Sequence, residues 1–123
     1  MGRARQLLVE ALCRIAASPD QLNDVFPRYV SVADELALSL DDAILVCRAQ
    51  ENLAELGAAP SVAVLDDHFR SFSGEENAQA WTMEAVRSDE RWILARELAR
   101  RALAELGEVL VPATRSYWID RPL

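Results

Sequence analysis

The stretch of residues 73–107 limits the possible folds most, because it predicts helix from a start signal to a stop signal. Ser73 and Glu76 have the spacing of a capping box, and Gly107 is a residue type that ends helices. Between these ends, apolar and small side chains recur at alternating steps of four and three residues: Trp81, Ala85, Ser88, Trp92, Ala95, Ala99, Ala102 and Leu106. That spacing places them on one face of a helix, so we expect this face to form the main seam of the core.

The same stretch is too long for one straight helix in a small domain. An unbroken helix over residues 74–106 would be about 50 Å long, whereas a domain of this size is only about 30 Å across. A break at Ser88 and Asp89, with one of the two as a new helix cap, keeps the chain compact. We therefore favour a break there over a continuous or merely kinked helix.

The rest of the chain also favours helix over sheet. Its apolar residues are mostly Ala, Leu and Val, and only 7% of all residues are aromatic. We expect further helices at residues 3–17, 21–26, 28–38, 39–56 and 61–72, the third of which also has strand propensity. Residues 108–111 look extended and Pro112 excludes helix, which predicts a short non-helical C-terminal tail. The sequence thus predicts a single all-α domain over residues 1–123, a compact bundle of five or six helices.

Local signals predict how these helices begin and which side of each faces the core. Ser39 with Asp42 resembles a capping box, Gly57 is expected to end that helix, and Ser61 is expected to cap the next one. Arg5 and Arg14 lie away from the apolar face of the first helix. The expected inward positions are Leu8, Leu12 and Ile15, then Leu45, Ala49, Leu53 and Leu56, then Val62, Leu65, Phe69 and Phe72.

Charge is distributed unevenly along the chain. The formal net charge is −7, and residues 20–90 contain fifteen acidic residues against four arginines. Such a field repels phosphate groups and anionic lipids, so we expect neither nucleic acid nor a membrane as the partner. A protein with a basic surface is the partner that this charge favours.

Cysteine usage and hydropathy predict the compartment. Cys13 and Cys47 each fall within an apolar helical stripe, which predicts two buried free thiols and no disulfide. Glu10 and Arg14 interrupt the N-terminal apolar residues, so there is no signal-peptide core. No apolar run approaches 18 residues, which argues against a transmembrane helix. We therefore expect a cytoplasmic protein.

The most site-like cluster in the sequence is Asp66, Asp67 and His68. Adjacent residues on a helix point about 100° apart, so these three side chains cannot converge on one metal ion or substrate. His68 is the only histidine, and a cysteine on an apolar stripe is a poor nucleophile because burial raises its pKa. The four glycines are scattered, which argues against a phosphate-binding loop. We expect no catalytic residue, no cofactor and no metal site.

Residues 54–57, followed by Pro60, resemble the turn of a helix-turn-helix DNA-binding unit. The resemblance implies a transcriptional regulator, which we keep as an alternative. The spacing differs from the usual pattern, with two residues in place of three between Ala54 and Gly57. The helix that would enter the DNA groove carries Asp66 and Asp67, which would meet phosphates with the wrong sign of charge.

Four arginines form a basic band near the end of the last predicted helix, namely Arg91, Arg96, Arg100 and Arg101. Pairs at i,i+4 with Glu97 and Glu105 explain this band as an ordinary salt-bridged helix face. Elsewhere, Glu51 and Glu55 are like charges at the same spacing, which destabilises a helix slightly unless a partner compensates.

These features together favour a non-enzymatic, acidic protein-binding module. Its most concrete form is an inhibitor of the bacterial immunity or antitoxin kind, which neutralises a basic toxin or effector by occluding it. The residues that we expect to contact the partner are Asp41, Asp42, Glu51, Glu55, Asp66, Asp67 and Trp118. The alternative from another class is a structural or adaptor subunit that forms a homodimer through its C-terminal helices.

Overall fold

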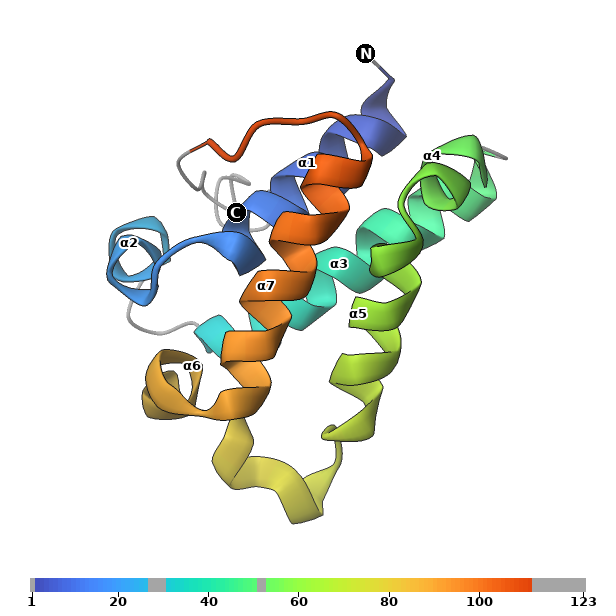
Figure 1. Ribbon diagram of the computed structural model, residues 1–123. Helices are drawn as coiled ribbons and strands as arrows, with labels where there is room; N and C mark the ends of the chain where they lie inside the picture. The colour runs from blue at the N-terminus through green and yellow to red at the C-terminus, as the bar shows by residue number, and fades with distance from the viewer. Residues whose placement is uncertain (1, 27–30, 51–52, 112–123) are drawn as a thin grey trace, which may run out of the picture.

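The computed structural model describes residues 2–26, 31–50 and 53–111, and every regular element within these ranges is a helix (Figure 1). The elements are α1 (Arg3–Ala16), α2 (Pro19–Val25), α3 (Val32–Ala49), α4 (Leu53–Ala58), α5 (Pro60–Ser71), the 3₁₀ helix η1 (Glu75–Trp81), α6 (Met83–Ser88) and α7 (Glu90–Glu105). The predicted compact all-α bundle is confirmed. No helix in these ranges is both long enough and apolar enough to cross a membrane.

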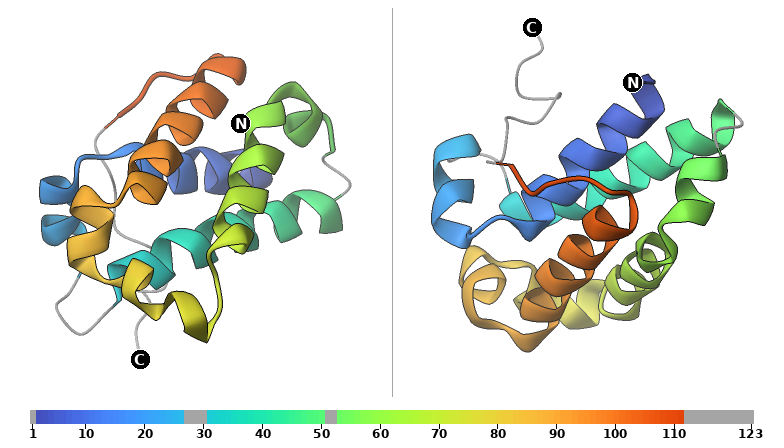
Figure 2. Two further views of the ribbon diagram at one scale, coloured as in Figure 1. Left: turned by 60° about the horizontal axis from the view of Figure 1, so that its bottom comes forward. Right: turned by 45° about the horizontal axis from the view of Figure 1, so that its top comes forward.

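Helix α1 contacts two of the other long helices of the bundle. It packs against α7 and against α3, while α5 packs against α7 from the other side (Figures 1 and 2). The predicted inward residues Leu8, Leu12 and Ile15 are almost completely buried. Because two helices cover α1, residues 11–17 are all buried and no outward side remains there. Arg14, which we expected to lie away from the core, is therefore only 4% exposed.

The predicted seam of the C-terminal helices is largely confirmed. Trp92, Ala95, Ala99 and Ala102 are at most 1% exposed, and these small alanines let α7 approach α1 and α5 closely. Ser88 is the exception: it is exposed because it lies at the helix break. The predicted inward face of α5 is also confirmed, since its four residues Val62, Leu65, Phe69 and Phe72 are buried.

Both ends of α7 lie where the sequence predicts them. The carboxylate of Asp89 caps the N-terminus by accepting a hydrogen bond from the Arg91 backbone N–H at 2.8 Å, which confirms the predicted break. At the other end Gly107 has φ +72°, a left-handed conformation that suits glycine. The Glu108 N–H donates to the Leu103 carbonyl oxygen at 2.9 Å, which closes a Schellman motif.

The start of the long C-terminal stretch differs from the prediction. Gly74, with φ +109°, precedes η1, and the Ser73 hydroxyl donates back to the Phe69 and Arg70 carbonyl oxygens instead of capping the next helix. A second break follows at Thr82, whose hydroxyl accepts from the Ala85 N–H at 3.1 Å. The stretch therefore forms three helical segments, where we expected two.

Helix α3 shows the largest departure from the sequence-based boundaries. Ser39, predicted to start a helix, is buried inside α3 and donates to the Leu36 carbonyl oxygen at 3.0 Å. The helix ends at Ala49, and Gly57, predicted to end it, lies within α4. Leu45 and Ala49 are exposed although we expected them to face the core. The buried residues are instead Ala33, Leu36, Ser39, Leu40, Ala43, Ile44 and Cys47.

Three smaller predictions have clear outcomes. Cys13 and Cys47 are both buried free thiols, as expected, and burial raises the pKa of Cys47. The N-cap of α5 is Ala59, so the prediction that Ser61 caps this helix is wrong. Residues 106–111 contain no regular helix, in agreement with the predicted tail, whereas residues 28–30 and 112–123 lie outside the described residues.

Candidate functional site

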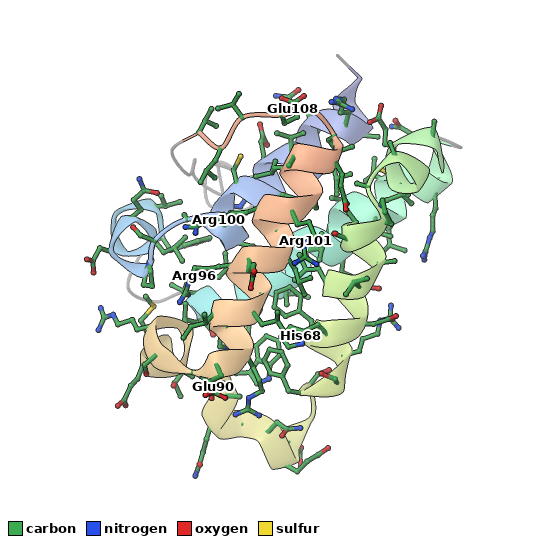
Figure 3. All side chains as sticks on the ribbon, in the orientation of Figure 1. His68, Glu90, Arg96, Arg100, Arg101 and Glu108 are labelled. Atoms are coloured by element: carbon green, nitrogen blue, oxygen red, sulfur yellow. The ribbon has the colours of Figure 1, made fainter. Side chains whose placement is uncertain are left out.

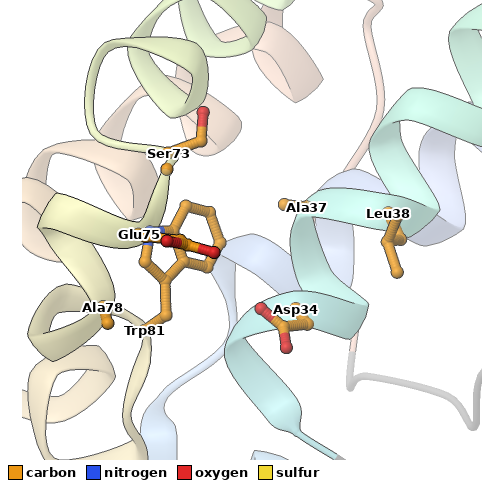
Figure 4. Close-up of a pocket in the computed structure, with 8 residues that line it drawn as sticks. Asp34, Ala37, Leu38, Ser73, Glu75, Ala78 and Trp81 are labelled. Carbon is orange, nitrogen blue, oxygen red and sulfur yellow. The ribbon is translucent and has the colours of Figure 1, made fainter.

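An open groove of about 720 Å³ lies between α3 and the segment that leads into η1 (Figure 4). Its lining residues are Asp34, Ala37, Leu38, Ser73, Gly74, Glu75, Ala78 and Trp81. Figure 4 shows the α3 residues on one side and Glu75, Ala78 and Trp81 on the other. The groove thus joins two segments that are about 40 residues apart in the sequence.

Trp81 forms a fixed aromatic wall of this groove. Its indole N–H donates to the Phe72 carbonyl oxygen at 2.8 Å. The indole ring stacks on Phe72 with centroids 5.0 Å apart, and Trp92 meets it edge-on at 5.4 Å. Because these contacts hold one side of the ring, the part that remains exposed is preorganised for a ligand.

One carboxylate lies on each side of the groove. Asp34 in the first turn of α3 and Glu75 in the first turn of η1 are both exposed. Among the described residues neither of them forms an ion pair, and the lining of the groove contains no basic side chain. The groove therefore offers negative charge beside an aromatic face, a combination that attracts a cation.

The contact residues predicted from the sequence are spread over three helices. Asp41 and Asp42 lie on α3, and Asp66 and Asp67 lie on α5. Glu55 on α4 forms an ion pair with Arg5, and Asp66 pairs with Arg70 at 3.3 Å, so these two charges are compensated within the chain.

The expected repulsion between Glu51 and Glu55 is offset at Glu55, because Arg5 supplies a positive charge to this carboxylate. Glu51 and Trp118 lie outside the described residues. The role of the predicted set as a partner-binding surface stays a prediction.

Asp34, Glu75 and Trp81 were not predicted as site residues. Trp81 was assigned to the core seam, and in the structure it is half-buried, with one part in the core and one part in the groove. Asp34 and Glu75 were only two of many acidic residues in the sequence. Each of them lies near the start of a helix. Acidic residues are common at helix N-termini, so this position does not indicate a binding site.

The cluster of Asp66, Asp67 and His68 does not converge. The His68 ring packs 5.2 Å from Phe72, and its Nε2 lies 2.7 Å from the Arg91 carbonyl oxygen. Because a carbonyl can only accept, Nε2 carries the proton and donates this hydrogen bond. Within the described ranges, no group of three His, Cys, Asp or Glu side chains could hold a metal ion.

The basic band on α7 is occupied by contacts within the chain. Arg96 donates to the Val86 carbonyl oxygen at 2.7 Å, and Arg100 donates to that of Ala16 at 3.3 Å. Figure 3 shows both arginines on the side of α7 that faces α6 and α2. The predicted pair of Arg101 with Glu97 is present at 3.9 Å.

The predicted pair of Arg101 with Glu105 is replaced by another contact. The Glu105 carboxylate accepts from the Ser61 N–H at 2.9 Å and from the Ser61 hydroxyl at 2.8 Å. This carboxylate therefore supplies the cap that Ser61 itself was expected to provide, and it ties the start of α5 to the end of α7.

The turn expected for a helix-turn-helix unit is displaced. Residues 54–57 lie inside α4, and only Ala59 separates α4 from α5. The inner side of α5 packs on α7, and its outer side carries Asp67. A DNA groove would meet this acidic side with repulsion.

The chain matches no protein-family model, and comparisons with curated proteins and with solved structures find no similar protein.

Proposed function

We propose that this protein is a non-enzymatic binding module that accepts a basic segment of a partner protein in the groove between α3 and η1. The observation that supports this proposal most is the position of two carboxylates that form no ion pair with any described residue. Glu75 lies on the same wall of the groove as Trp81, and Asp34 lies on the opposite wall (Figure 4). Among such modules we favour an inhibitor of the immunity or antitoxin kind, which occludes a basic toxin or effector.

Arginine is the side chain that suits this groove best. Its planar guanidinium can stack on the exposed part of the Trp81 indole while its N–H groups donate to the two carboxylates. Each such charge-assisted hydrogen bond is stronger than a neutral one. The net charge of −7 would in addition steer a basic partner toward the chain and make the association rate fall with salt.

The alternative of self-association through the C-terminal helices has less support. Ala95 and Ala99, at the middle of the proposed seam, are both 0% exposed because α7 packs on α1 and α5. Any self-association therefore has to use another surface.

A defined peptide tests the proposal better than a cell lysate. The probe is a short fluorescent peptide with two arginines, and its affinity is measured by fluorescence anisotropy with ¹H–¹⁵N spectra to map the contact. The double variant Asp34→Asn/Glu75→Gln should bind at least about tenfold more weakly, because it removes both charged acceptors. A peptide with neutral citrulline in place of arginine should lose binding to a similar extent.

The matched control is Asp20→Asn/Asp67→Asn, which removes the same net charge from exposed positions on α2 and α5. This control should change the affinity by less than about twofold at physiological salt. Equal weakening by both double variants would mean that only the overall charge matters, and the groove proposal would then be wrong. Absence of binding by the unmodified protein would be equally decisive against it.

A further inference from the structure

The outward face of α3 carries a nearly symmetric pattern of charge and apolar side chains. Asp34, Leu38, Asp41, Leu45 and Arg48 follow each other at steps of four, three, four and three residues, so they share one side of the helix. Leu38 and Leu45 are each 52% exposed. Two large leucines at heptad spacing on an exposed helix face are typical of a helix–helix contact.

The two ends of this face have opposite charges. Asp34 and Arg48 have no ion pair with any described residue, and they lie about 21 Å apart along the helix axis. When two copies of α3 are placed antiparallel about a two-fold axis near Asp41, Asp34 of one copy comes opposite Arg48 of the other. Leu38 and Leu45 then lie within one residue, about 1.5 Å along the axis, of the same level at both ends of the contact.

From this self-complementary pattern, we propose that the protein forms a weak symmetric homodimer through antiparallel packing of α3 on α3. A two-fold interface uses every contact twice, so the face supplies two leucine pairs and two ion pairs. A second copy fits the face better than a basic peptide or an anionic membrane does, because one end of the face is basic and the rest is acidic. A single pair of helices buries little area, so the dimer should dissociate in the range of about 10–1000 μM.

The two copies of Asp41 oppose this association. They meet near the two-fold axis, where like charges in contact are destabilising. This feature tests the proposed geometry, because removal of the Asp41 charge should strengthen the association more than removal of the exposed Asp67 charge on α5, which lies outside the proposed interface.

The dimer would also cover Asp34, which flanks the groove. If the groove binds a basic partner as proposed above, self-association and partner binding compete for the same carboxylate. This consequence rests on the proposed function, whereas the dimer itself does not.

Sedimentation equilibrium between about 10 μM and 1 mM tests the dimer. The Leu45→Ser variant should weaken association by more than about tenfold, because the lost contact occurs twice. Val64→Ser is the matched control, since Val64 on α5 is 53% exposed and lies outside the proposed interface. Asp41→Asn should strengthen association severalfold.

A charge exchange gives the sharpest check of the register. Arg48→Asp and Asp34→Arg should each weaken the dimer, and the double variant should restore it because the ion pairs re-form in the opposite direction. A protein that stays monomeric at 1 mM would refute the dimer, and so would a dimer that tolerates both Leu45→Ser and Arg48→Asp. The separate roles stay distinguishable, because Glu75→Gln should weaken only peptide binding and Arg48→Asp only self-association.

Discussion

Replacement of Asp89 by asparagine tests how strongly the break before α7 depends on a charged cap. The Asp89 carboxylate accepts hydrogen bonds from the Arg91 side chain at 3.0 and 2.8 Å, and from the Arg91 backbone N–H at 2.8 Å. These bonds lower the pKa of Asp89 from 3.8 to about 2, and the hydrogen bonds from the Arg91 side chain contribute most to this shift. Asparagine keeps an acceptor oxygen for the cap but loses the charge.

The expected loss of stability follows from this pKa shift. A shift of this size corresponds to at most about 2 kcal/mol of folding free energy at neutral pH. The Asp89 side chain is 24% exposed, so solvent screening reduces this value, and we expect the variant to lose about 1 kcal/mol. For a domain of this size the melting temperature should fall by about 3–5 °C.

The stability that the Asp89 carboxylate contributes should decrease as the pH falls. Because the pKa of Asp89 is lower in the folded state than in the unfolded chain, its contribution is fully present well above pH 3.8. The contribution is lost as the pH falls through 3.8 toward 2. The difference between the native protein and Asp89→Asn should therefore be constant from pH 7 to about pH 5 and shrink steadily below that.

Urea unfolding followed by circular dichroism, repeated between pH 7 and pH 3, measures this difference directly. Asp67→Asn is the control, since Asp67 is an exposed carboxylate on α5, and its effect should stay within about 0.5 kcal/mol. A variant as stable as the native protein at pH 7, or a difference that does not change with pH, would refute the assignment of a charged cap.

Two further substitutions test other parts of the fold. Arg14→Met should raise the free energy of unfolding by about 1 kcal/mol or more, because the Arg14 side chain is buried and its Nε and Nη1 have no hydrogen-bond partner among the described residues. Thermal melts beside the exposed control Arg87→Met measure this, and a destabilised Arg14→Met would contradict it. Gly107→Ala should cost about 1 kcal/mol because of its positive φ, whereas Gly57→Ala, in the open space beside α4, should be neutral or slightly stabilising. Equal effects of the two glycine substitutions in urea unfolding would show that the conformation at Gly107 is not strained for alanine.

At the two ends of α7, local signals in the sequence are sufficient to predict the structure, whereas the signals at Ser39, Ser61 and Ser73 are not. The cap at Asp89 and the end at Gly107 depend on contacts between residues close together in the chain, whereas the inward face of α5 follows from its hydrophobic periodicity. These contacts need no partner from a distant part of the chain, so the sequence predicts them correctly. Hydrophobic periodicity likewise determined the all-α class.

The tertiary structure decided which side of a helix is buried when its sequence permits more than one. α3 carries apolar residues on several sides, and its contact with α1 selects Leu40 and Ile44 for the core and leaves Leu45 outside. Arg14 is buried because α3 and α7 cover α1 from two sides. No local pattern could show this, since burial depends on how many neighbours a helix has.

The candidate site also depends on tertiary packing. Asp34 and Glu75 are unremarkable acidic residues in the sequence, and Trp81 has the spacing of a core residue. They become a groove only because α3 and the start of η1 come together across about 40 residues of intervening chain. The sequence by itself determined the helices, several of their ends and the acidic charge, whereas the packing of distant segments decided where that charge meets an exposed aromatic ring.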